Sequence, residues 1–424
     1  MNTREKLMEE LANKGTFKSY IFFWAGQLFS LLGSSIVQFV IVVWITLETG
    51  SLLVLSWANF FLMFPTLFIT PMAGVFSDRY DRKKLILIVD STQAALTVIL
   101  IGFFWFNFIN LTVIFSFLSL RTICQAFHSP VVAAITPSMV PKDKLSRMNG
   151  FDFLFSGLIN IIGYPIGGAL LTFFDIKFIL WVDVITFFIA LIPLILVKFP
   201  IVHLNHNKDE KKSFLEDFKI GIKVFRAIPG FVLLLFIVMV VNFFLQPLLV
   251  LMPYYILNTH GGTVLLLGFI EMLFPLASLF GALIPSFKKT WKNKILVVII
   301  GLIFINIGYL AYALAPTGFF PIIASGTILI GFILPIINTI GFTIFQTVVP
   351  KDKIGRVLSI ILTLSMMISP LGAVIAGPMS LMLGITILYF YCAIIGICIA
   401  LISYFCTNLR HIDFDKEYEL NLIN

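Results

Sequence analysis

Four ionisable residues stand well inside long apolar runs of the sequence: Asp90, Arg121, Asp183 and Glu271. An arginine at the centre of a membrane helix costs roughly 2.5 to 3.5 kcal/mol on insertion scales, so such residues usually face a partner or a water-filled cavity. There a carboxylate can take up and release a proton. The residue types and their apolar surroundings therefore predict a proton-coupling set.

Two acids of this set, Asp90 and Asp183, also have a structural interpretation. Asp90 follows Lys84 by only six residues, so its carboxylate could reach the membrane surface or pair with a cytoplasmic cation. Asp183 could cap a helix or bridge two helices. Glu271 is the acid that lies deepest in an apolar run of the second half, which favours a proton or substrate site.

Arg121 is followed at i+4 and i+7 by Gln125 and His128, which places the three side chains on one face of a helix. His128 has an ordinary pKa near neutrality and could titrate in the working range. A lone helix histidine beside Pro130 could equally have a structural role. The face of this helix is therefore a candidate functional surface.

Composition fixes the class of protein. Of 424 residues, 59% are hydrophobic, 12% are charged and 46 are phenylalanine, which is too much apolar surface for a water-soluble core. A membrane-spanning helix needs roughly 20 apolar residues. We predict an all-α integral membrane protein with twelve transmembrane helices, over residues 18–47, 52–76, 85–107, 111–134, 147–173, 177–199, 229–257, 263–286, 294–314, 319–345, 354–382 and 384–408.

One short segment occurs twice, beginning at Val140 and again at Val349, with six of eight positions identical. Each copy lies between two apolar runs, so we interpret it as a loop in two similar halves fused in the same direction. The prediction is two pseudo-symmetric six-helix bundles. The predicted parts are an N-terminal segment 1–17, a bundle 18–199, a linker 200–228, a bundle 229–408 and a tail 409–424.

Basic residues predict the orientation, because positively charged loops tend to stay in the cytoplasm. Of the 29 Lys and Arg residues, all except Arg121 and Lys177 fall at the two ends of the chain or in loops on one side. We therefore expect a multi-pass protein of the cell membrane with both termini cytoplasmic. The net charge of +8 belongs to this bias, so no nucleic-acid partner is predicted.

After the second apolar run comes a G-x-x-x-D-R-x-x-R-K motif, the most specific signal in the chain. This form is found in the major facilitator superfamily. We interpret it as a cytoplasmic gate that the second half lacks, with the repeat segments supplying partner charges. Solvated loop charges are the alternative for the two repeat aspartates. The predicted gate residues are Gly74, Asp78, Arg79, Arg82, Lys83, Asp143, Arg147, Asp352 and Arg356.

Polar side chains isolated in apolar helices are candidates for a substrate cavity. The alternative for each is an interhelical hydrogen bond, worth about 0.6 kcal/mol, and we expect about half of the set to line the cavity. The candidates are Gln27, Gln38, Asn59, Gln125, His128, Asn242, Gln246, Phe274, Asn306, Asn338 and Gln346.

The chain has no G-x-x-x-x-G-K-[ST] loop, no H-E-x-x-H pair and no nucleophile elbow. Its four cysteines have no metal or redox spacing and resemble small apolar residues. We therefore predict no enzyme activity, no cofactor and no metal. The expected partners are a small-molecule substrate, protons and the lipid bilayer, and a monomer is expected.

Several segments together resemble the macrolide-efflux (Mef-type) proteins of the major facilitator superfamily. They are Trp24–Gln27, Thr49–Ser51, Asp78–Lys84, Ala126–Pro130, Thr136–Pro137, Val140–Pro141, Asp183–Val184 and Gly355–Val357. The resemblance implies a twelve-helix exporter that exchanges protons for amphipathic drugs by alternating access. It places Arg121 at the helix 4 arginine linked to proton coupling.

Other functions fit the same residues. A siderophore exporter, a lysolipid flippase and an uptake symporter share this architecture, since the direction of flux is not written in the fold. A membrane sensor that transports nothing belongs to a different class. The gate motif and the charges inside the apolar runs favour a transporter over a sensor.

Overall fold

The structure, a computed structural model, describes residues 14–200, 223, 227–288, 291–350, 354–412 and 414. Within these residues the regular structure is entirely helical, and twelve segments are long and apolar enough to cross a membrane. The predicted all-α membrane fold is confirmed.

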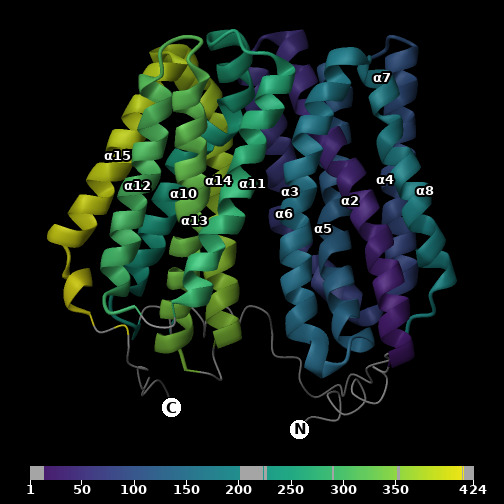
Figure 1. The fold of residues 1–424 in the computed structure, drawn as a ribbon, viewed down its shortest axis with the longest axis horizontal. Helices are drawn as coiled ribbons and strands as arrows, with labels where there is room; N and C mark the ends of the chain where they lie inside the picture. The colour runs from purple at the N-terminus through teal and green to yellow at the C-terminus, as the bar shows by residue number, and fades with distance from the viewer. Residues whose placement is uncertain are drawn as a thin grey trace. The chain divides into compact units, whose positions relative to one another are not determined.

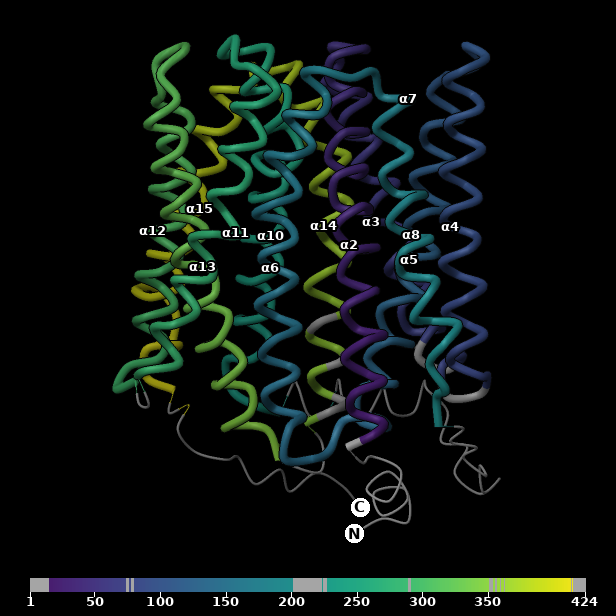
Figure 2. Tube along the Cα trace, turned by 45° about the vertical axis from the view of Figure 1, so that its right-hand side comes forward, coloured from purple at the N-terminus to yellow at the C-terminus, as the bar shows by residue number. Residues whose placement is uncertain are grey.

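The chain divides into two compact units. The first unit holds α2 (Lys14–Thr49), most of α3 (Leu52–Arg79), α4 (Arg82–Trp105), α5 (Leu111–Met139), α6 (Lys142–Phe173), α7 (Ile176–Ile179) and α8 (Trp181–Leu196), with residues Thr263–Met272 of α11. In this unit α2 packs against α6 and α8, and α4 packs against α5 and α8 (Figures 1 and 2).

The second unit holds Ser51–Ser56 and the second half of the helices. These are α10 (Phe231–Tyr254), η1 (Tyr255–Thr259), the remainder of α11 (Val264–Phe287), α12 (Lys294–Leu314), α13 (Phe320–Val348), α14 (Ile354–Leu383), α15 (Ile385–Phe405) and η2 (Asn408–His411). Here α12 packs against α13 and α15, and α10 packs against α14 and α15 (Figure 1).

The first repeat segment is not a loop, contrary to the prediction. Val140 and Pro141 alone connect α5 to α6, and the charged residues from Lys142 onward form the first turns of α6. Pro141 has φ −55° and stands at the N-cap, where a missing N–H costs nothing. The prediction was wrong because it took the charged residues to mark a loop, whereas a helix can carry charged residues where it leaves the apolar layer.

Two predicted spans contain irregular turns. The sixth divides at Leu180 into the short α7 and the longer α8. The seventh ends in a single π-helical turn, Tyr255–Thr259. Most of the predicted linker 200–228 lies outside the described residues, as does most of the C-terminal tail.

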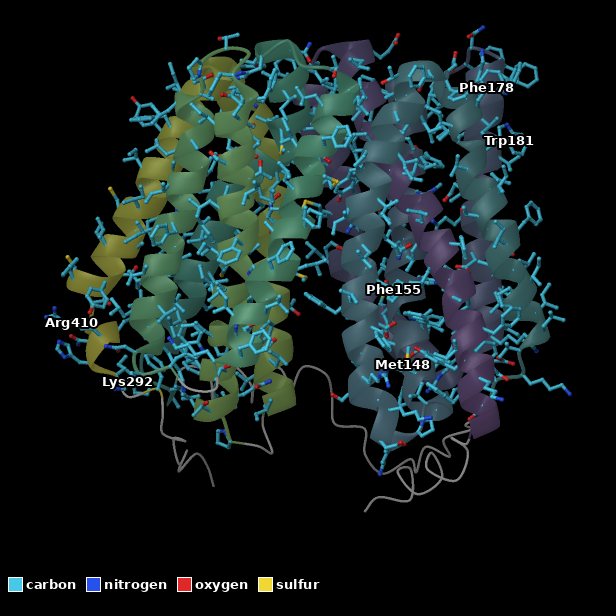
Figure 3. The ribbon with its side chains drawn as sticks, in the orientation of Figure 1. Met148, Phe155, Phe178, Trp181, Lys292 and Arg410 are labelled. Carbon is cyan, nitrogen blue, oxygen red and sulfur yellow. The ribbon has the colours of Figure 1, made fainter. Side chains whose placement is uncertain are left out.

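Large apolar side chains cover the outside of the helices, as a protein surrounded by lipid requires. Phe178 and Trp181 are about half exposed and extend away from α7 and α8 (Figure 3). Lys177, the cation predicted on the opposite side from the other basic residues, lies 5.1 Å above the Trp105 ring and 3.5 Å from Asp175. An aromatic cluster with a shielded cation suits the boundary between lipid and water.

Candidate functional site

A buried ion pair joins α5 to α8 inside the first unit. Arg121 Nη1 donates to Asp183 Oδ2 at 2.7 Å, and Nη2 donates to Oδ1 at 3.0 Å. Arg121 is 6% exposed and Asp183 is 4% exposed. The two parallel bonds match the planar guanidinium to the carboxylate and fix both side chains.

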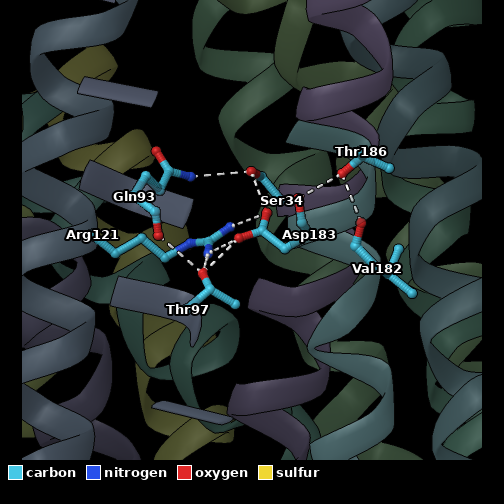
Figure 4. A network of polar contacts seen from close by, with 7 residues as sticks. All are labelled: Ser34, Gln93, Thr97, Arg121, Val182, Asp183 and Thr186. Atoms are coloured by element: carbon cyan, nitrogen blue, oxygen red, sulfur yellow. Dashed lines mark hydrogen bonds and ion pairs between the residues drawn. The ribbon is translucent and has the colours of Figure 1, made fainter. Parts of the chain in front are cut away.

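Hydroxyl groups from two more helices complete this ion pair. Thr97 of α4 donates to Asp183 Oδ2 at 2.7 Å, and Ser34 of α2 donates to Oδ1 at 2.9 Å (Figure 4). Gln93 of α4 in turn donates to the Ser34 hydroxyl at 3.1 Å. The Asp183 carboxylate therefore accepts four hydrogen bonds, which compensate for its removal from water.

A second polar cluster lies in the same unit. His128 Nε2 of α5 is 3.0 Å from Gln27 Oε1 of α2 and 3.5 Å from Asp90 Oδ1 of α4. All three side chains are less than a tenth exposed. The interpretation of Asp90 as a surface carboxylate is therefore wrong, because the chain buries it against His128.

The two clusters share one spacing on three helices. Ser34 follows Gln27 by seven residues on α2, Thr97 follows Asp90 by seven on α4, and His128 follows Arg121 by seven on α5. Seven residues are about two helical turns, or roughly 10 Å of rise. We call the Arg121 cluster, which also includes Gln93 of α4 and Asp183 of α8, the upper layer, and the His128 cluster the lower layer.

Glu271 contrasts with both layers. It lies in the middle of α11, is partly buried, and forms no hydrogen bond or ion pair with any other residue that the structure describes. A carboxylate in a membrane helix without a compensating group is costly in its charged form. Its surroundings suit a group that gains and loses a proton.

Two of the predicted gate residues, Arg82 and Lys83, bind backbone carbonyl oxygens of other helices. Lys83 Nζ donates to the carbonyl oxygens of Ile195 and Val197, each at 2.7 Å, at the end of α8. Arg82 Nη1 donates to the carbonyl oxygen of Ala134 in α5 at 2.7 Å. Lys83 thus satisfies carbonyl groups at the C-terminus of α8, where the last carbonyl groups have no partner within the helix.

The remaining gate residues divide into two sets. Asp143 and Arg147 are exposed on the first turns of α6, and Arg147 lies over the Phe151 ring at 5.3 Å. Their pairing across the gate stays a prediction. The side chains of Gly74, Asp78, Arg79 and Arg356, and the whole of Asp352, lie outside the described residues.

The cavity candidates fall into three groups. Gln27, His128, Gln246 and Asn306 are buried; Asn59, Gln125, Asn242 and Phe274 are partly buried; Gln38, Asn338 and Gln346 are exposed. Gln27 and His128 belong to the lower layer, and Asn306 Nδ2 donates to the Leu302 carbonyl of its own helix at 2.8 Å. These three therefore have the helix-bridging or helix-stabilising contacts of the alternative interpretation.

The second unit has a cluster of tyrosines that sequence reasoning missed. Tyr255, Tyr309, Tyr312 and Tyr389 are each at most 1% exposed, and the Tyr255 hydroxyl donates to the Tyr312 carbonyl. His260 packs against Tyr255 with the ring centroids 4.4 Å apart and the rings tilted by 58°. Burial lowers the pKa of His260 below its ordinary value.

Sequence reasoning also missed Ser34, Gln93 and Thr97 in the upper layer, and the hydrogen bond from the Trp24 indole to Asp152. For Ser34 and Thr97 the signal was a seven-residue spacing from another polar residue on the same helix, Gln27 on α2 and Asp90 on α4. In the part of the chain that the structure describes, no three His, Cys, Asp or Glu residues gather as metal ligands would.

The sequence profile of the Major Facilitator Superfamily matches residues 23–373 of this chain. The chain belongs to the Major Facilitator Superfamily. Its family membership agrees with the expected transporter architecture and points away from an enzyme.

Within this superfamily, the chain is similar to macrolide efflux protein A of Streptococcus pyogenes, with 26% identity over 92% of this chain and 96% of that protein. It also matches the staphyloferrin A transporter of Staphylococcus aureus, with 31% identity over 35% of this chain and 38% of that protein. The multidrug efflux pump Tap of Mycolicibacterium fortuitum is 22% identical over 83% of this chain and 87% of its own length. The Mef-type resemblance is confirmed.

Solved structures of other transporters share the fold. The nucleoside transporter NupG matches with a TM-score of 0.68 at 13% identity, over 92% of this chain and 98% of that one. A bacterial homologue of the iron transporter ferroportin matches with a TM-score of 0.68 at 15% identity, over 91% of this chain and 98% of that one. At these identities the likeness concerns the fold alone.

Proposed function

We propose that this protein is a proton-coupled exporter of amphipathic drugs such as macrolides, working by alternating access in the cell membrane. The observation that carries the proposal is the similarity to macrolide efflux protein A along 92% of the chain. The proposal includes a cytoplasmic position for both termini, which the distribution of basic residues supports.

Glu271 is the proposed carrier of the coupling proton. Its partly buried carboxylate has no hydrogen bond or ion pair with another described residue, so binding a proton removes an uncompensated charge. A cationic drug near the same carboxylate would displace that proton. Competition between the two cations gives exchange without any covalent step.

Arg121 and Asp183 take a different role in this proposal. Their charges already neutralise each other through bonds of 2.7 and 3.0 Å. A carboxylate with four donors has little affinity for a further proton. The pair therefore holds α4, α5 and α8 in register, while the proton is carried elsewhere.

The energetics permit export without ATP. One proton that enters across about 100 mV and one pH unit releases about 3.7 kcal/mol, which can sustain roughly a 500-fold gradient of a neutral substrate. Exchange of one proton for one monovalent cation moves no net charge, so the pH unit alone, about 1.4 kcal/mol, sustains about a tenfold gradient of a cationic drug. Proton-driven export requires only that substrate and proton bind in alternation.

Proteoliposomes loaded with a macrolide test the proposal. An imposed inward proton gradient should drive macrolide out of vesicles that contain the native chain, and Glu271→Gln should abolish this gradient dependence. Glu48→Gln is the matched control, because Glu48 is an exposed acid in the last turn of α2. Equal proton-driven flux in Glu271→Gln and Glu48→Gln vesicles would remove Glu271 from the mechanism.

Siderophore export is the second candidate. The local match to the staphyloferrin A transporter, at 31% identity, favours it, although that match covers only 35% of this chain. Carboxylate-rich siderophores are anions, so their flux should not compete with a cationic macrolide at Glu271. The same vesicles, loaded with an iron-free siderophore, distinguish the two substrate classes by whether added macrolide reduces the siderophore flux.

A further inference from the structure

The lower layer has a geometry that the proposed function does not use. One imidazole nitrogen, His128 Nε2, faces two oxygen atoms, Gln27 Oε1 at 3.0 Å and Asp90 Oδ1 at 3.5 Å. Without a hydrogen among these three atoms, their lone pairs would face one another. A proton therefore lies between α2, α4 and α5 at this level.

Two protonation states of the lower layer fit the same atoms. With one extra proton, either His128 is an imidazolium beside the Asp90 carboxylate, or both groups are neutral, and the net charge is zero in both forms. When that proton leaves, the Nε2–H of neutral His128 still donates to Gln27, while Asp90 keeps a buried charge. The proton belongs to the pair and not to either residue alone.

The Gln27 amide adds a second adjustable group. Its side chain is only 3% exposed, and its Nε2 has no hydrogen-bond partner in the described structure. A half-turn of the amide exchanges its oxygen for the N–H group. Gln27 can therefore offer an acceptor to an imidazolium or a donor to a carboxylate, so that each protonation state finds a complementary partner.

The charged and titratable groups around Asp90 come from each helix packed against α4. They are His128 and Cys124 on α5 and Asp183 on α8, while α2 presents the neutral Gln27. Arg121 and Asp183 neutralise each other in the upper layer. One proton therefore changes the net charge of the lower layer, whereas the upper layer holds a pair whose charges already cancel.

We propose that Gln27, Asp90 and His128 form a second proton site, at which one exchangeable proton is shared between the Asp90 carboxylate and the His128 imidazole. The proton comes from water and returns to water, and no other bond forms or breaks. The site deepens the proposed function and rests on it for a role in coupling. It is separate from Glu271, so the proposal gives the transporter two proton sites, one at Glu271 and one in the lower layer.

Proton binding can be measured without any substrate. The purified full-length chain in lipid nanodiscs is titrated in weak buffer between about pH 5 and 9, the range in which a histidine pair exchanges protons. Among the groups that exchange protons in this range, the pair should contribute one step to the titration curve of the native chain. Asp90→Asn and His128→Gln should each lower the midpoint of that step, because each removes one of the two groups that share the proton. The double variant should lack the step.

His128→Gln keeps a polar side chain of similar reach, so the test stands even if Asp90→Asn fails to fold. An unchanged midpoint in His128→Gln would overturn the proposal. Glu271→Gln should leave this midpoint where it is; loss of the step in Glu271→Gln would assign the proton to Glu271, which overturns the second site but not the proposed export. A shifted step together with macrolide flux that ignores the proton gradient would reject the export mechanism and retain the site.

Discussion

The guanidinium of Arg121 and the carboxylate of Asp183 lie side by side with both pairs of atoms in hydrogen-bonding distance, at 2.7 and 3.0 Å, deep inside the first unit. Each charge is tolerated there because the other is present. A buried pair of this kind contributes little net stability, yet removing one partner is strongly destabilising. The coupling between the two charges can be measured by comparing single and double variants.

Arg121→Met and Asp183→Leu should each lower the free energy of unfolding by about 3 to 5 kcal/mol, since each leaves an uncompensated buried charge. The double variant should recover most of this loss because it buries no charge. Denaturant unfolding in detergent micelles measures all three. A double variant that loses the sum of the two single losses would show that the two charges are not coupled.

Lys83→Met should loosen the end of α8 while it keeps the apolar stem of the side chain. Lys83 Nζ donates to the Ile195 and Val197 carbonyls, and a partly exposed charged hydrogen bond contributes about 0.5 to 1.5 kcal/mol. Hydrogen exchange in the last turn of α8 should accelerate from about twofold to about tenfold. Lys84→Met is the control, because Lys84 is the exposed neighbour. Equal exchange in the two variants would contradict the capping role.

Gly33→Ala should force α2 and α8 apart, since a Cβ at Gly33 would overlap the Thr186 side chain. Overpacking of this kind costs about 1 to 3 kcal/mol. Gly102→Ala is the matched control: no other atom lies within 4 Å of its added Cβ, and alanine favours the helix by up to about 1 kcal/mol. The two variants should therefore move the melting temperature in opposite directions. A melting temperature for Gly33→Ala at or above that of the native chain would show that the two helices can separate at no cost.

His260 should make the second unit less stable in acid. Its Nδ1 accepts a hydrogen bond from the Gly318 N–H at 3.2 Å, and burial lowers its folded pKa below the ordinary value of 6.5. The unfolded chain therefore binds more protons than the folded chain between the folded pKa and 6.5. The stabilisation is complete above 6.5 and is lost as the pH falls through the folded pKa. His260→Phe retains a ring against Tyr255 but cannot titrate, so its melting temperature should vary less with pH below 6.5. The same acid dependence in both proteins would assign the effect to another group.

The sequence was sufficient for the membrane class, the number of spans and the special status of Arg121, because apolar runs and a charge within them have direct physical costs. It did not reveal that Arg121 pairs with Asp183, which stands 62 residues away on a helix whose neighbours depend on tertiary packing. Ser34 and Thr97 were missed for a related reason. Hydroxyl groups are common in membrane helices, and only the assembled unit shows which of them face a charge.

The contacts of the gate motif could not be predicted from its residues. The motif predicts charges that act across the cytoplasmic side, whereas Lys83 and Arg82 bind carbonyl oxygens of α8 and α5 within the first unit. A motif reports which residues are present, but the packing of the helix ends decides what those residues bind. Asp81 illustrates the point, because its side chain caps α4 by accepting from the Lys83 and Lys84 amides.

The seven-residue spacing on α2, α4 and α5 has a consequence for relatives of this chain. Because the side chains of a layer bind one another, a substitution at one position changes what the others must supply. Relatives that lack an acid at the position of Asp183 should also lack the arginine at the position of Arg121, and loss of His128 should accompany loss of Asp90. The two layers should therefore appear as two separate groups of covarying positions in an alignment of homologues.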